Sequence, residues 1–237
     1  MTKIKFSLVI PCYNESGTIT KLVKRCKKIF KDKHHEIIFI DNGSTDNTLK
    51  KLEKEVRGIN NFKIIKIPVN KGLGYGIVMG LMKTKGEIIG WTHGDLQTDP
   101  IDAFKGFEIA SQTEGDFLIK GRRINRKFTD FFFSLGMAIL ESLIHFNIYW
   151  EINAQPNIFR KSFFRLWKTP PYDYMIDLYC YHMALKKRLK FIRFEVEMKP
   201  RIAGESKWNL NFLSKINFII KNIKYSFKLY KIKDDSY

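Results

Sequence analysis

Cysteine is scarce in this chain of 237 residues, and the three that occur lie far apart: Cys12, Cys26 and Cys180. Their spacing fits neither a disulfide framework nor a zinc site, which favours a reducing, cytosolic setting. Long hydrophobic runs are also lacking. The most apolar stretch, 128–150, is interrupted by charged residues and a histidine, so no membrane-spanning helix is predicted. The N-terminal apolar run is too short for a signal peptide.

Acidic residues are few relative to basic ones. The chain has 42 Lys and Arg against 24 Asp and Glu, a net charge of +18. Such a surface favours anions, which include nucleic acid, phosphorylated ligands and an acidic membrane face. A codon bias toward Lys, Ile, Asn and Phe is the alternative explanation, although it does not account for the excess of Lys over Glu. A hydrophobic content of 44% predicts a folded domain rather than a disordered chain.

The first 120 residues alternate short apolar runs with helical patterns. Strands are expected at 6–11, 36–41, 62–67, 87–91 and 116–120, and helices at 16–30, 48–56, about 71–84 and from Pro100 onward. This alternation predicts an α/β fold with a mostly parallel central sheet and helices on both faces. Ligands in such sheets bind at the carboxyl ends of the strands.

The second half of the sequence is less regular. We expect helices at 128–147 and 174–187, a strand within 153–160, a half-exposed strand at 191–197 and a polar loop at 201–208. A basic C-terminal helix follows to about residue 233. Its apolar stripe has the spacing of one helix face: Leu213, Ile216, Ile220, Ile223, Phe227 and Tyr230. This amphipathic helix could lie on an anionic membrane, together with Phe131–Phe133, or pack against its own domain or a partner subunit.

Two motifs bear on the ligand. The glycine-rich run at 71–76 lacks the spacing of a dinucleotide fingerprint, so its glycines allow a close backbone approach to a ligand or to the sheet. Asp41 ends one predicted strand and Asp95 follows another. Carboxylates on the edge of so basic a protein fit a divalent cation held together with substrate phosphates. Alternatively, Asp41 caps a turn and Asp95 only shapes a loop.

Four segments together, VIPCYNES, DNGSTDNT, NKGLGYG and GDLQTDP, resemble the family-2 glycosyltransferases, which have the Rossmann-like GT-A fold. RIAGESKW and GRRINR are similar to motifs of the branch that contains dolichol-phosphate mannose synthases and polyprenyl-phosphate sugar transferases. The likeness covers roughly residues 5–208. It implies an inverting transfer of a sugar from a UDP- or GDP-sugar, with Mn²⁺ or Mg²⁺, to a polyprenyl phosphate or a lipid-linked glycan.

The resemblance also implies roles for individual residues. The nucleotide sugar would contact Pro11, Tyr13, Glu15, Asp41, Asn70, Lys71, Gly74 and Asp95. The metal would be held by Asp95 and Gln97. The acceptor phosphate would be held by Arg122, Arg123, Arg126, Arg201, Ser206 and Lys207. The catalytic residues would be Asp95 and Asp177, the latter as the base if the acceptor is a hydroxyl, with Glu151 second. Otherwise, Asp177 is a helix carboxylate paired with a lysine.

Two departures from the family pattern stand out. His93 replaces the first Asp of the usual Asp-x-Asp, and is a metal ligand, a donor to phosphate or a loop residue. The segment 155–157 replaces a glycine-containing motif that ends in a basic residue. His93 makes an inactive nucleotide-binding scaffold one alternative. The basic charge makes a nucleic-acid binder another, which the acidic residues at the sheet edge disfavour, and a nucleotidyltransferase is disfavoured by the sequence after the first strand.

The predicted organisation is a glycosyltransferase domain at 1–208, with a nucleotide half at 1–120 and an acceptor half at 121–208. A basic helix and tail would follow at 209–237. We expect a cytoplasmic protein that is peripheral on the membrane and has no nucleic acid partner.

Overall fold

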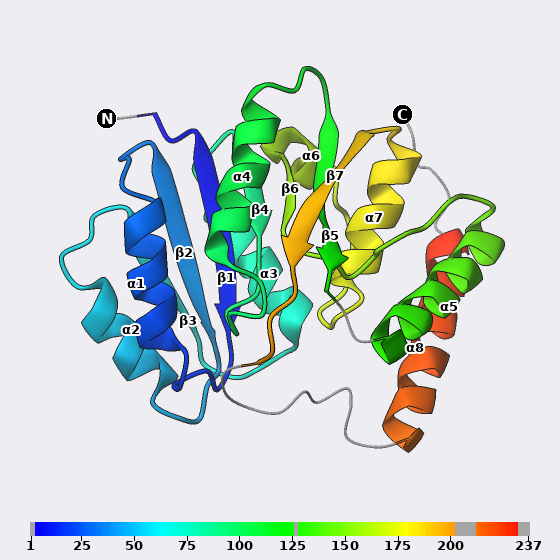
Figure 1. Ribbon diagram of the computed structural model, residues 1–237, viewed down its shortest axis with the longest axis horizontal. Coiled ribbons are helices and arrows are strands. Elements are labelled where there is room, and N and C mark those ends of the chain that lie inside the picture. Colours follow the sequence, from blue (N-terminus) through cyan, green and yellow to red (C-terminus); the bar gives the residue numbers. More distant parts are fainter. Residues whose placement is uncertain (1–2, 126–127, 202–211, 232–237) are drawn as a thin grey trace.

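The computed structural model describes residues 3–125, 128–201 and 212–231, which form seven strands and eight helices (Figure 1). The strands are β1 (Phe6–Cys12), β2 (His35–Asn42), β3 (Phe62–Ile67), β4 (Ile88–Trp91), β5 (Phe117–Ile124), β6 (Asn157–Arg160) and β7 (Lys190–Glu197). The helices are α1 (Ile19–Ile29), α2 (Thr48–Val56), α3 (Leu73–Met82), α4 (Pro100–Ser111), α5 (Phe128–His145), α6 (Lys161–Arg165), α7 (Ile176–Lys186) and α8 (Phe212–Lys231).

One sheet runs through the molecule in the order β3-β2-β1-β4-β6-β5-β7. Strand β6 is antiparallel to both neighbours, β4 and β5, whereas the other pairs are parallel. The sheet is therefore mostly parallel, as predicted. The carboxyl ends of its parallel strands meet at the lower edge in Figure 1.

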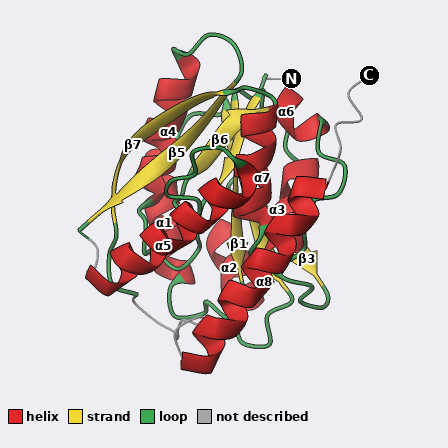
Figure 2. Cartoon of the chain, turned by 90° about the vertical axis from the view of Figure 1, so that its right-hand side faces the viewer, coloured by secondary structure: helices red, strands yellow, loops and turns green. Residues whose placement is uncertain are grey.

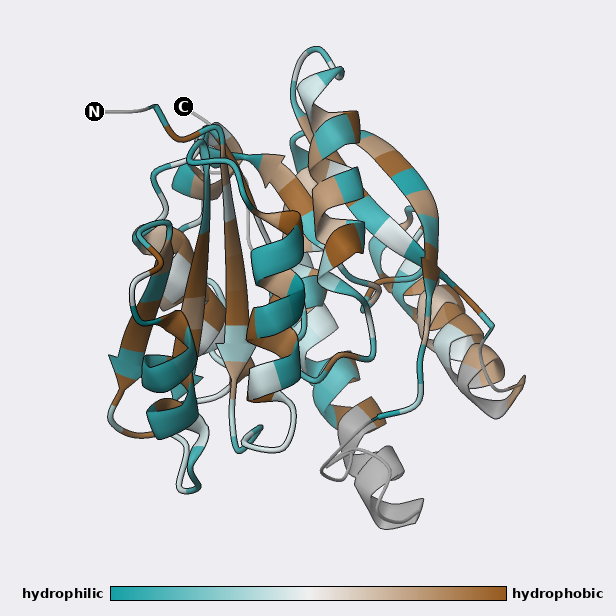
Figure 3. Ribbon diagram, turned by 60° about the vertical axis from the view of Figure 1, so that its left-hand side comes forward, coloured by the Kyte–Doolittle hydropathy of each residue, from teal (hydrophilic) through white to brown (hydrophobic). Residues whose placement is uncertain are grey.

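Helices cover both faces of the sheet, and the alternation of side chains along the strands explains how (Figure 2). On β1, Phe6, Leu8 and Ile10 pack with apolar residues of α1, α2 and α4, whereas Val9 points to the other face. There it joins residues of α3, α6 and α7. Strands buried on both faces are apolar along most of their length, as the brown strands in Figure 3 show. This continuous apolarity made them recognisable in the sequence.

Two local features differ from expectation. Strand β5 continues to Ile124, so the arginines of the GRR segment lie on the strand and not after it. The five-residue helix α6 directly follows β6 and was not predicted. It is too short for a helical period to be visible in the sequence.

Helices α5 and α8 pack against each other beside α7, and a buried polar cluster lies between them. The side chain of Glu141 is fully buried and accepts a hydrogen bond from Ser226 Oγ, which lies 2.6 and 2.7 Å from its two oxygens. His145 Nε2 lies 3.5 Å from the same carboxylate. Apolar side chains instead face outward: Phe128, Phe131, Phe132, Ile139 and Leu143 on α5, Phe146 and Ile148 just after it, and Ile220, Phe227 and Tyr230 on α8. We call these ten residues the outer apolar surface.

Three described residues of the predicted C-terminal stripe, Ile220, Phe227 and Tyr230, are thus exposed, whereas Ile223 is half-buried. Phe227 is 51% and Tyr230 56% exposed, whereas Asn222, Ser226 and Leu229 are buried. The side chains of Leu213 and Ile216 lie outside the described residues. Helix α8 thus packs against its own domain, as one of the alternatives held, but it does so through Asn222, Ser226 and Leu229 and not mainly through the described part of the stripe. Within the described residues, every helix is too short or too polar to cross a bilayer.

Candidate active site

The carboxyl ends of β1, β2 and β4 bring the predicted nucleotide residues to one edge of the sheet. Cys12 at the end of β1 pairs with Asp41 on β2, and Pro11 is the preceding residue. Asp41 is 2% exposed, and its Oδ1 accepts a hydrogen bond from the backbone N–H of Ser44 at 3.3 Å. This contact is the turn-capping role considered from the sequence, and it leaves the second carboxylate oxygen without a hydrogen bond from the described residues.

The loop after β1 holds Tyr13 and Glu15. The Glu15 N–H donates to Thr48 Oγ1 at 2.8 Å, and Thr18 Oγ1 donates to Glu15 Oε2 at 3.2 Å. These contacts tie the loop to the starts of α1 and α2. Asn14 adopts a left-handed conformation with φ of 55°, which Asn tolerates better than most residues. The carboxylate of Glu15 is therefore fixed near the edge of the sheet.

Asp95 is the centre of the site. It is 4% exposed, its Oδ1 accepts the backbone N–H of Gln97 at 3.1 Å, and its Oδ2 accepts from Arg201 Nη2 at 2.8 Å. The Lys199 N–H donates to the carbonyl of Gln97 at 2.8 Å, which holds the segment before Arg201 against this loop. A guanidinium supplied from more than one hundred residues away thus covers the carboxylate predicted to bind metal.

Glu15 shares this environment. Burial raises the pKa of Glu15 to about 7, and the negative charge of Asp95 adds to the rise, whereas Arg201 opposes it. Two carboxylates and one guanidinium therefore lie within electrostatic reach of one another. A second cation would lower the energy of this arrangement.

The site fits a divalent metal held partly by substrate. Among the described residues, no cluster of three or more His, Cys, Asp or Glu side chains is arranged to hold an ion without further ligands. Mg²⁺ and Mn²⁺ commonly use one or two carboxylates together with substrate phosphates. Asp95 and the Gln97 amide could supply the protein's share of such a set.

The glycine-rich loop lies beside this edge, and Gly74 packs closely against the backbone of the 171–173 segment. A Cβ on Gly74 would meet the carbonyl oxygens of Pro171 at 2.2 Å and Asp173 at 2.6 Å, and the Gly74 N–H donates to the Asp173 carbonyl. Gly74 therefore allows a close approach to the 171–173 segment, whereas Gly76 lies against the sheet, where a Cβ would meet the Asn42 side chain of β2 at 3.0 Å. Asn70 Oδ1 accepts from the Gly72 N–H at 2.8 Å, and the Lys71 ammonium lies over the Tyr75 ring.

Asp177 lies in the first turn of α7 within a buried polar network. Its Oδ1 accepts from Asn157 Nδ2 at 2.8 Å, and Asn157 Oδ1 in turn accepts from the ammonium of Lys120. Burial raises the pKa of Asp177, which the charges of Lys120 and His93 oppose, and burial lowers the pKa of Lys120 to about 8. Asp177 is thus linked to a lysine, as its non-catalytic interpretation supposed, although in the core.

Lys120 and Asn157 are residues of this network whose role sequence reasoning missed. They face each other across β5 and β6, and both are fully buried. A lysine inside the apolar strand segment FLIK was the available signal, because a charge in a buried strand requires a partner.

Each described arginine of the predicted phosphate-binding set pairs with a different carboxylate. Arg122 pairs with Glu195 on β7 and is exposed, and Arg123 Nε donates to Glu151 Oε2 at 2.7 Å in a largely buried ion pair. Arg201 lies on Asp95, as described above. Arg126, Ser206 and Lys207 fall outside the described residues.

Comparison with known proteins identifies the family to which the chain belongs. The family model described as glycosyl transferase family 2 matches residues 7–193. The chain is 33% identical over 129 residues to an undecaprenyl-phosphate 4-deoxy-4-formamido-L-arabinose transferase of Proteus mirabilis, covering 52% of this chain and 38% of that protein. It is 34% identical over 127 residues to a dodecaprenyl-phosphate galacturonate synthase of Rhizobium johnstonii, covering 52% of this chain and 37% of that protein. The matched region thus spans less than two fifths of either relative.

Among solved structures, glucosyl-3-phosphoglycerate synthase of Mycobacterium tuberculosis with Mn²⁺, UDP-glucose and phosphoglyceric acid has a TM-score of 0.75. The alignment covers 98% of this chain and 82% of that one at 15% identity. At this identity the match bears on the fold alone, and it confirms the predicted fold class.

Proposed function

Because the chain belongs to glycosyl transferase family 2, we propose that it catalyses an inverting, divalent-metal-dependent transfer from a nucleoside diphosphate sugar to a lipid phosphate. The observation that carries this proposal is the position of Asp95. Its carboxylate lies at the carboxyl edge of the sheet, within reach of Glu15, and is covered by the guanidinium of Arg201. This is a site for a cation bound together with an anionic ligand.

The nucleotide would occupy the edge formed by β1 and β2. Asp41 would accept hydrogen bonds from the base, with Pro11, Tyr13 and Glu15 lining the pocket. Asn70, Lys71 and Gly74 would lie along its side. A UDP- or a GDP-sugar fits this description, and the solved relative above binds UDP-glucose.

Asp95 and Gln97 would hold Mn²⁺ or Mg²⁺ against the donor diphosphate. When bound, such an ion neutralises the charge that develops on the leaving diphosphate. The solved relatives include complexes with Mn²⁺ and with Mg²⁺, each together with UDP. On metal binding, Arg201 would leave Asp95 and contact a phosphate oxygen, since Arg suits phosphate geometry.

A lipid phosphate is the acceptor that we propose, as the names of the Proteus and Rhizobium relatives contain polyprenyl phosphates. An oxygen of the acceptor phosphate would attack the anomeric carbon from the face opposite the diphosphate. The new C–O bond forms as the bond to the diphosphate breaks, and the nucleoside diphosphate leaves. A phosphate oxygen is already ionised, so Asp177 would act as a base only for a hydroxyl acceptor.

The outer apolar surface would place the enzyme on the cytoplasmic face of a membrane. Phe146 is 86%, Phe128 77% and Leu143 68% exposed, while Glu141 of α5 and Ser226 of α8 are buried between the two helices. On a surface that faces water, polar side chains are expected outside and apolar side chains between the helices. The exposed Lys224, Lys228 and Lys231 of α8 would contact anionic headgroups.

Thermal shift with a panel of nucleotides and nucleotide sugars, with and without Mn²⁺, tests the donor proposal. A metal-dependent rise with one base is expected, because a ligand that binds only the folded state stabilises it. Absence of a shift with every nucleotide would contradict the proposal and favour a scaffold. A radiolabelled transfer assay to undecaprenyl phosphate then tests the acceptor.

Flotation with liposomes tests the membrane proposal. Wild-type protein is expected to float with anionic vesicles, and the Phe146→Ser/Phe227→Ser variant to float much less. Lys50→Ala, an exposed cation far from this surface, is the control. Equal flotation of wild type and the double variant would contradict a role for the outer apolar surface.

A further inference from the structure

A basic cavity of about 390 Å³ lies at the amino edge of the sheet, opposite the candidate active site. Its charged lining consists of Lys3, Lys85, Arg160, Lys161, Arg165 and Glu87. Five of the lining residues are thus basic and one is acidic. The volume lies within the range of sites for small molecules.

The topology explains why these residues meet. Lys3 precedes β1 and Lys85 precedes β4, whereas Arg160 ends β6. Because β6 is antiparallel to β4, Arg160 pairs with Ile88, the first residue of β4. The cavity is therefore separated from Asp95 by the length of the strands, which is about 20 Å for the seven-residue β1.

The side chains of Arg160 and Lys161 donate hydrogen bonds to backbone carbonyls, which are neutral. Arg160 Nε donates to the Gly115 carbonyl at 2.7 Å and Nη2 to the Thr113 carbonyl at 3.1 Å, with the guanidinium over the Phe117 ring. The Lys161 ammonium donates to the Thr84 carbonyl. Carbonyls fix these groups in place without cancelling their charge.

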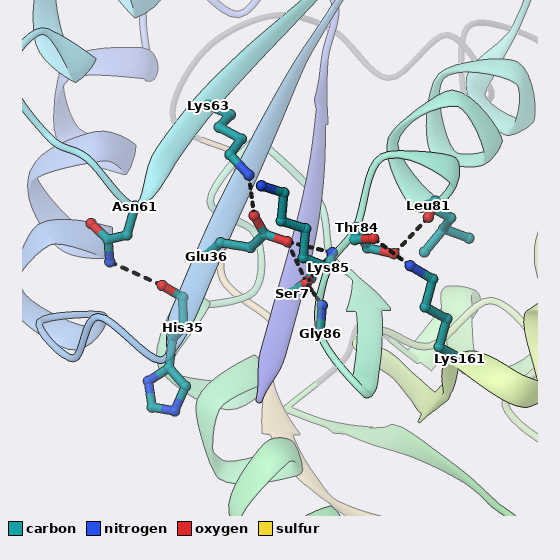
Figure 4. A network of polar contacts seen from close by, with 10 residues as sticks. All are labelled: Ser7, His35, Glu36, Asn61, Lys63, Leu81, Thr84, Lys85, Gly86 and Lys161. Atoms are coloured by element: carbon teal, nitrogen blue, oxygen red, sulfur yellow. Dashed lines mark hydrogen bonds and ion pairs between the residues drawn. The ribbon is translucent and has the colours of Figure 1, made fainter. Parts of the chain in front are cut away.

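The 85–86 turn, which lines the cavity, is fixed by a buried network (Figure 4). Glu36, 1% exposed, accepts from the Lys85 N–H at 2.6 Å and from Ser7 Oγ at 2.7 Å, and the Gly86 N–H donates to Ser7 Oγ at 2.7 Å. The Glu36 carboxylate also pairs with Lys63. It therefore holds the 85–86 turn, and its charge is balanced by Lys63.

Glu87 offsets little of the remaining charge. Its side chain is 60% exposed and lies 3.6 Å from Lys3 and 3.4 Å from Arg160, distances at which exposed pairs contribute weakly. Among the described residues, the Lys85 ammonium and the Arg165 guanidinium have no carboxylate partner. The cavity thus retains unbalanced positive charge beside a turn that Glu36 and Ser7 hold in place.

We propose that this basic cavity is a second ligand site, which binds a small phosphate-bearing anion independently of the sugar donor. Arginine and lysine residues from three segments of the chain line it, and their guanidinium and ammonium groups are the donors that suit phosphate oxygens. The excess of basic residues in the sequence is then partly explained by a site that the transfer reaction does not use.

Isothermal titration with inorganic pyrophosphate in EDTA tests the proposal, since chelation removes any metal-dependent contribution of the donor site. Lys85→Ala/Arg165→Ala removes two cavity cations that make no structural hydrogen bond through their side chains. Lys50→Ala/Lys54→Ala removes two exposed cations of α2 and controls for net charge. Arg201→Ala removes a cation from the candidate active site.

Wild type, the α2 control and Arg201→Ala are expected to bind pyrophosphate alike, and the cavity variant at least tenfold more weakly. Thermal shift by UDP with Mn²⁺ should be the same in the cavity variant and wild type. Loss of pyrophosphate binding in Arg201→Ala but not in the cavity variant would overturn the proposal, as would an equal loss in the α2 control. Absence of binding to wild type would also overturn it.

Discussion

Replacing Lys120 by Met should destabilise the protein strongly, because it leaves the buried carboxylate of Asp177 without a nearby positive charge. Both groups are fully or nearly fully buried, and Asn157 joins them by hydrogen bonds on either side. Removing one partner of a buried charge pair costs about 3–5 kcal/mol. Each kcal/mol lowers Tm by about 2–4 °C in a chain of this size, so we expect a fall of about 6–20 °C.

The measurement is thermal and urea unfolding followed by circular dichroism. Lys105→Met is the matched control, since Lys105 pairs with Asp102 at 3.2 Å but its side chain is 54% exposed. That change should cost no more than about 1 kcal/mol. The double variant Lys120→Met/Asp177→Asn should recover much of the stability, because no charge is then left unpaired.

Two results would refute this reasoning. A Tm for Lys120→Met within a few degrees of Lys105→Met would mean that Asp177 needs no cation, either because it is protonated or because water reaches it. A double variant no more stable than Lys120→Met would mean that the loss came from packing of the lysine stem and not from charge. Either outcome would remove the electrostatic account of the network.

Three further predictions concern other sites. Asp95→Ala should abolish sugar transfer while far-UV circular dichroism stays unchanged; retained transfer would contradict the metal site. Glu15 has a folded pKa of about 7 against 4.5 as a free group, so the stability it contributes below pH 4.5 is lost as pH rises through 7. Relative to Glu15→Gln, wild type should therefore lose about 1–2 kcal/mol over this range, after allowance for its partial exposure; parallel pH profiles of urea unfolding would contradict this. Gly80→Ala should lower the free energy of unfolding in urea by about 1–3 kcal/mol, because the new Cβ would meet Val9 Cγ1 at 2.4 Å. The control is Gly136→Ala, whose Cβ would meet nothing within 4 Å and which should not destabilise the protein. Equal effects of the two variants would refute the steric argument.

The first half of the fold was predictable because its signals are local. Parallel strands that are buried on both faces are continuous apolar runs, as in EIIFID, and polar turn residues mark where each ends. The position of β6 was not predictable in the same way. Its four residues carry little periodicity, and its antiparallel pairing with β4 and β5 depends on where the chain returns after α5.

In the candidate site, too, some features could be predicted from local sequence and others depended on distant parts of the chain. Asp41 and Asp95 could be placed at one edge because strand order and strand ends determine it. The contact of Arg201 with Asp95 could not, since the two residues are separated by more than one hundred positions and no pattern in the sequence pairs them. The network of Lys120, Asn157 and Asp177 likewise depends on which strands become neighbours.

The Asp95–Arg201 pair links these observations to the proposed reaction. A nearly buried carboxylate beside Glu15 needs a cation in every state of the enzyme, since an unpaired buried charge is costly. The guanidinium meets this need in the structure described, and the metal would meet it when donor is bound. When the metal replaces the guanidinium on Asp95, Arg201 becomes available to hold the acceptor phosphate. Its side chain is 29% exposed. On this account Arg201→Ala should weaken use of the acceptor, seen as a rise in its KM, and leave donor binding with Mn²⁺ largely intact. The reverse pattern, with donor binding lost and acceptor KM unchanged, would show that Arg201 serves the donor instead.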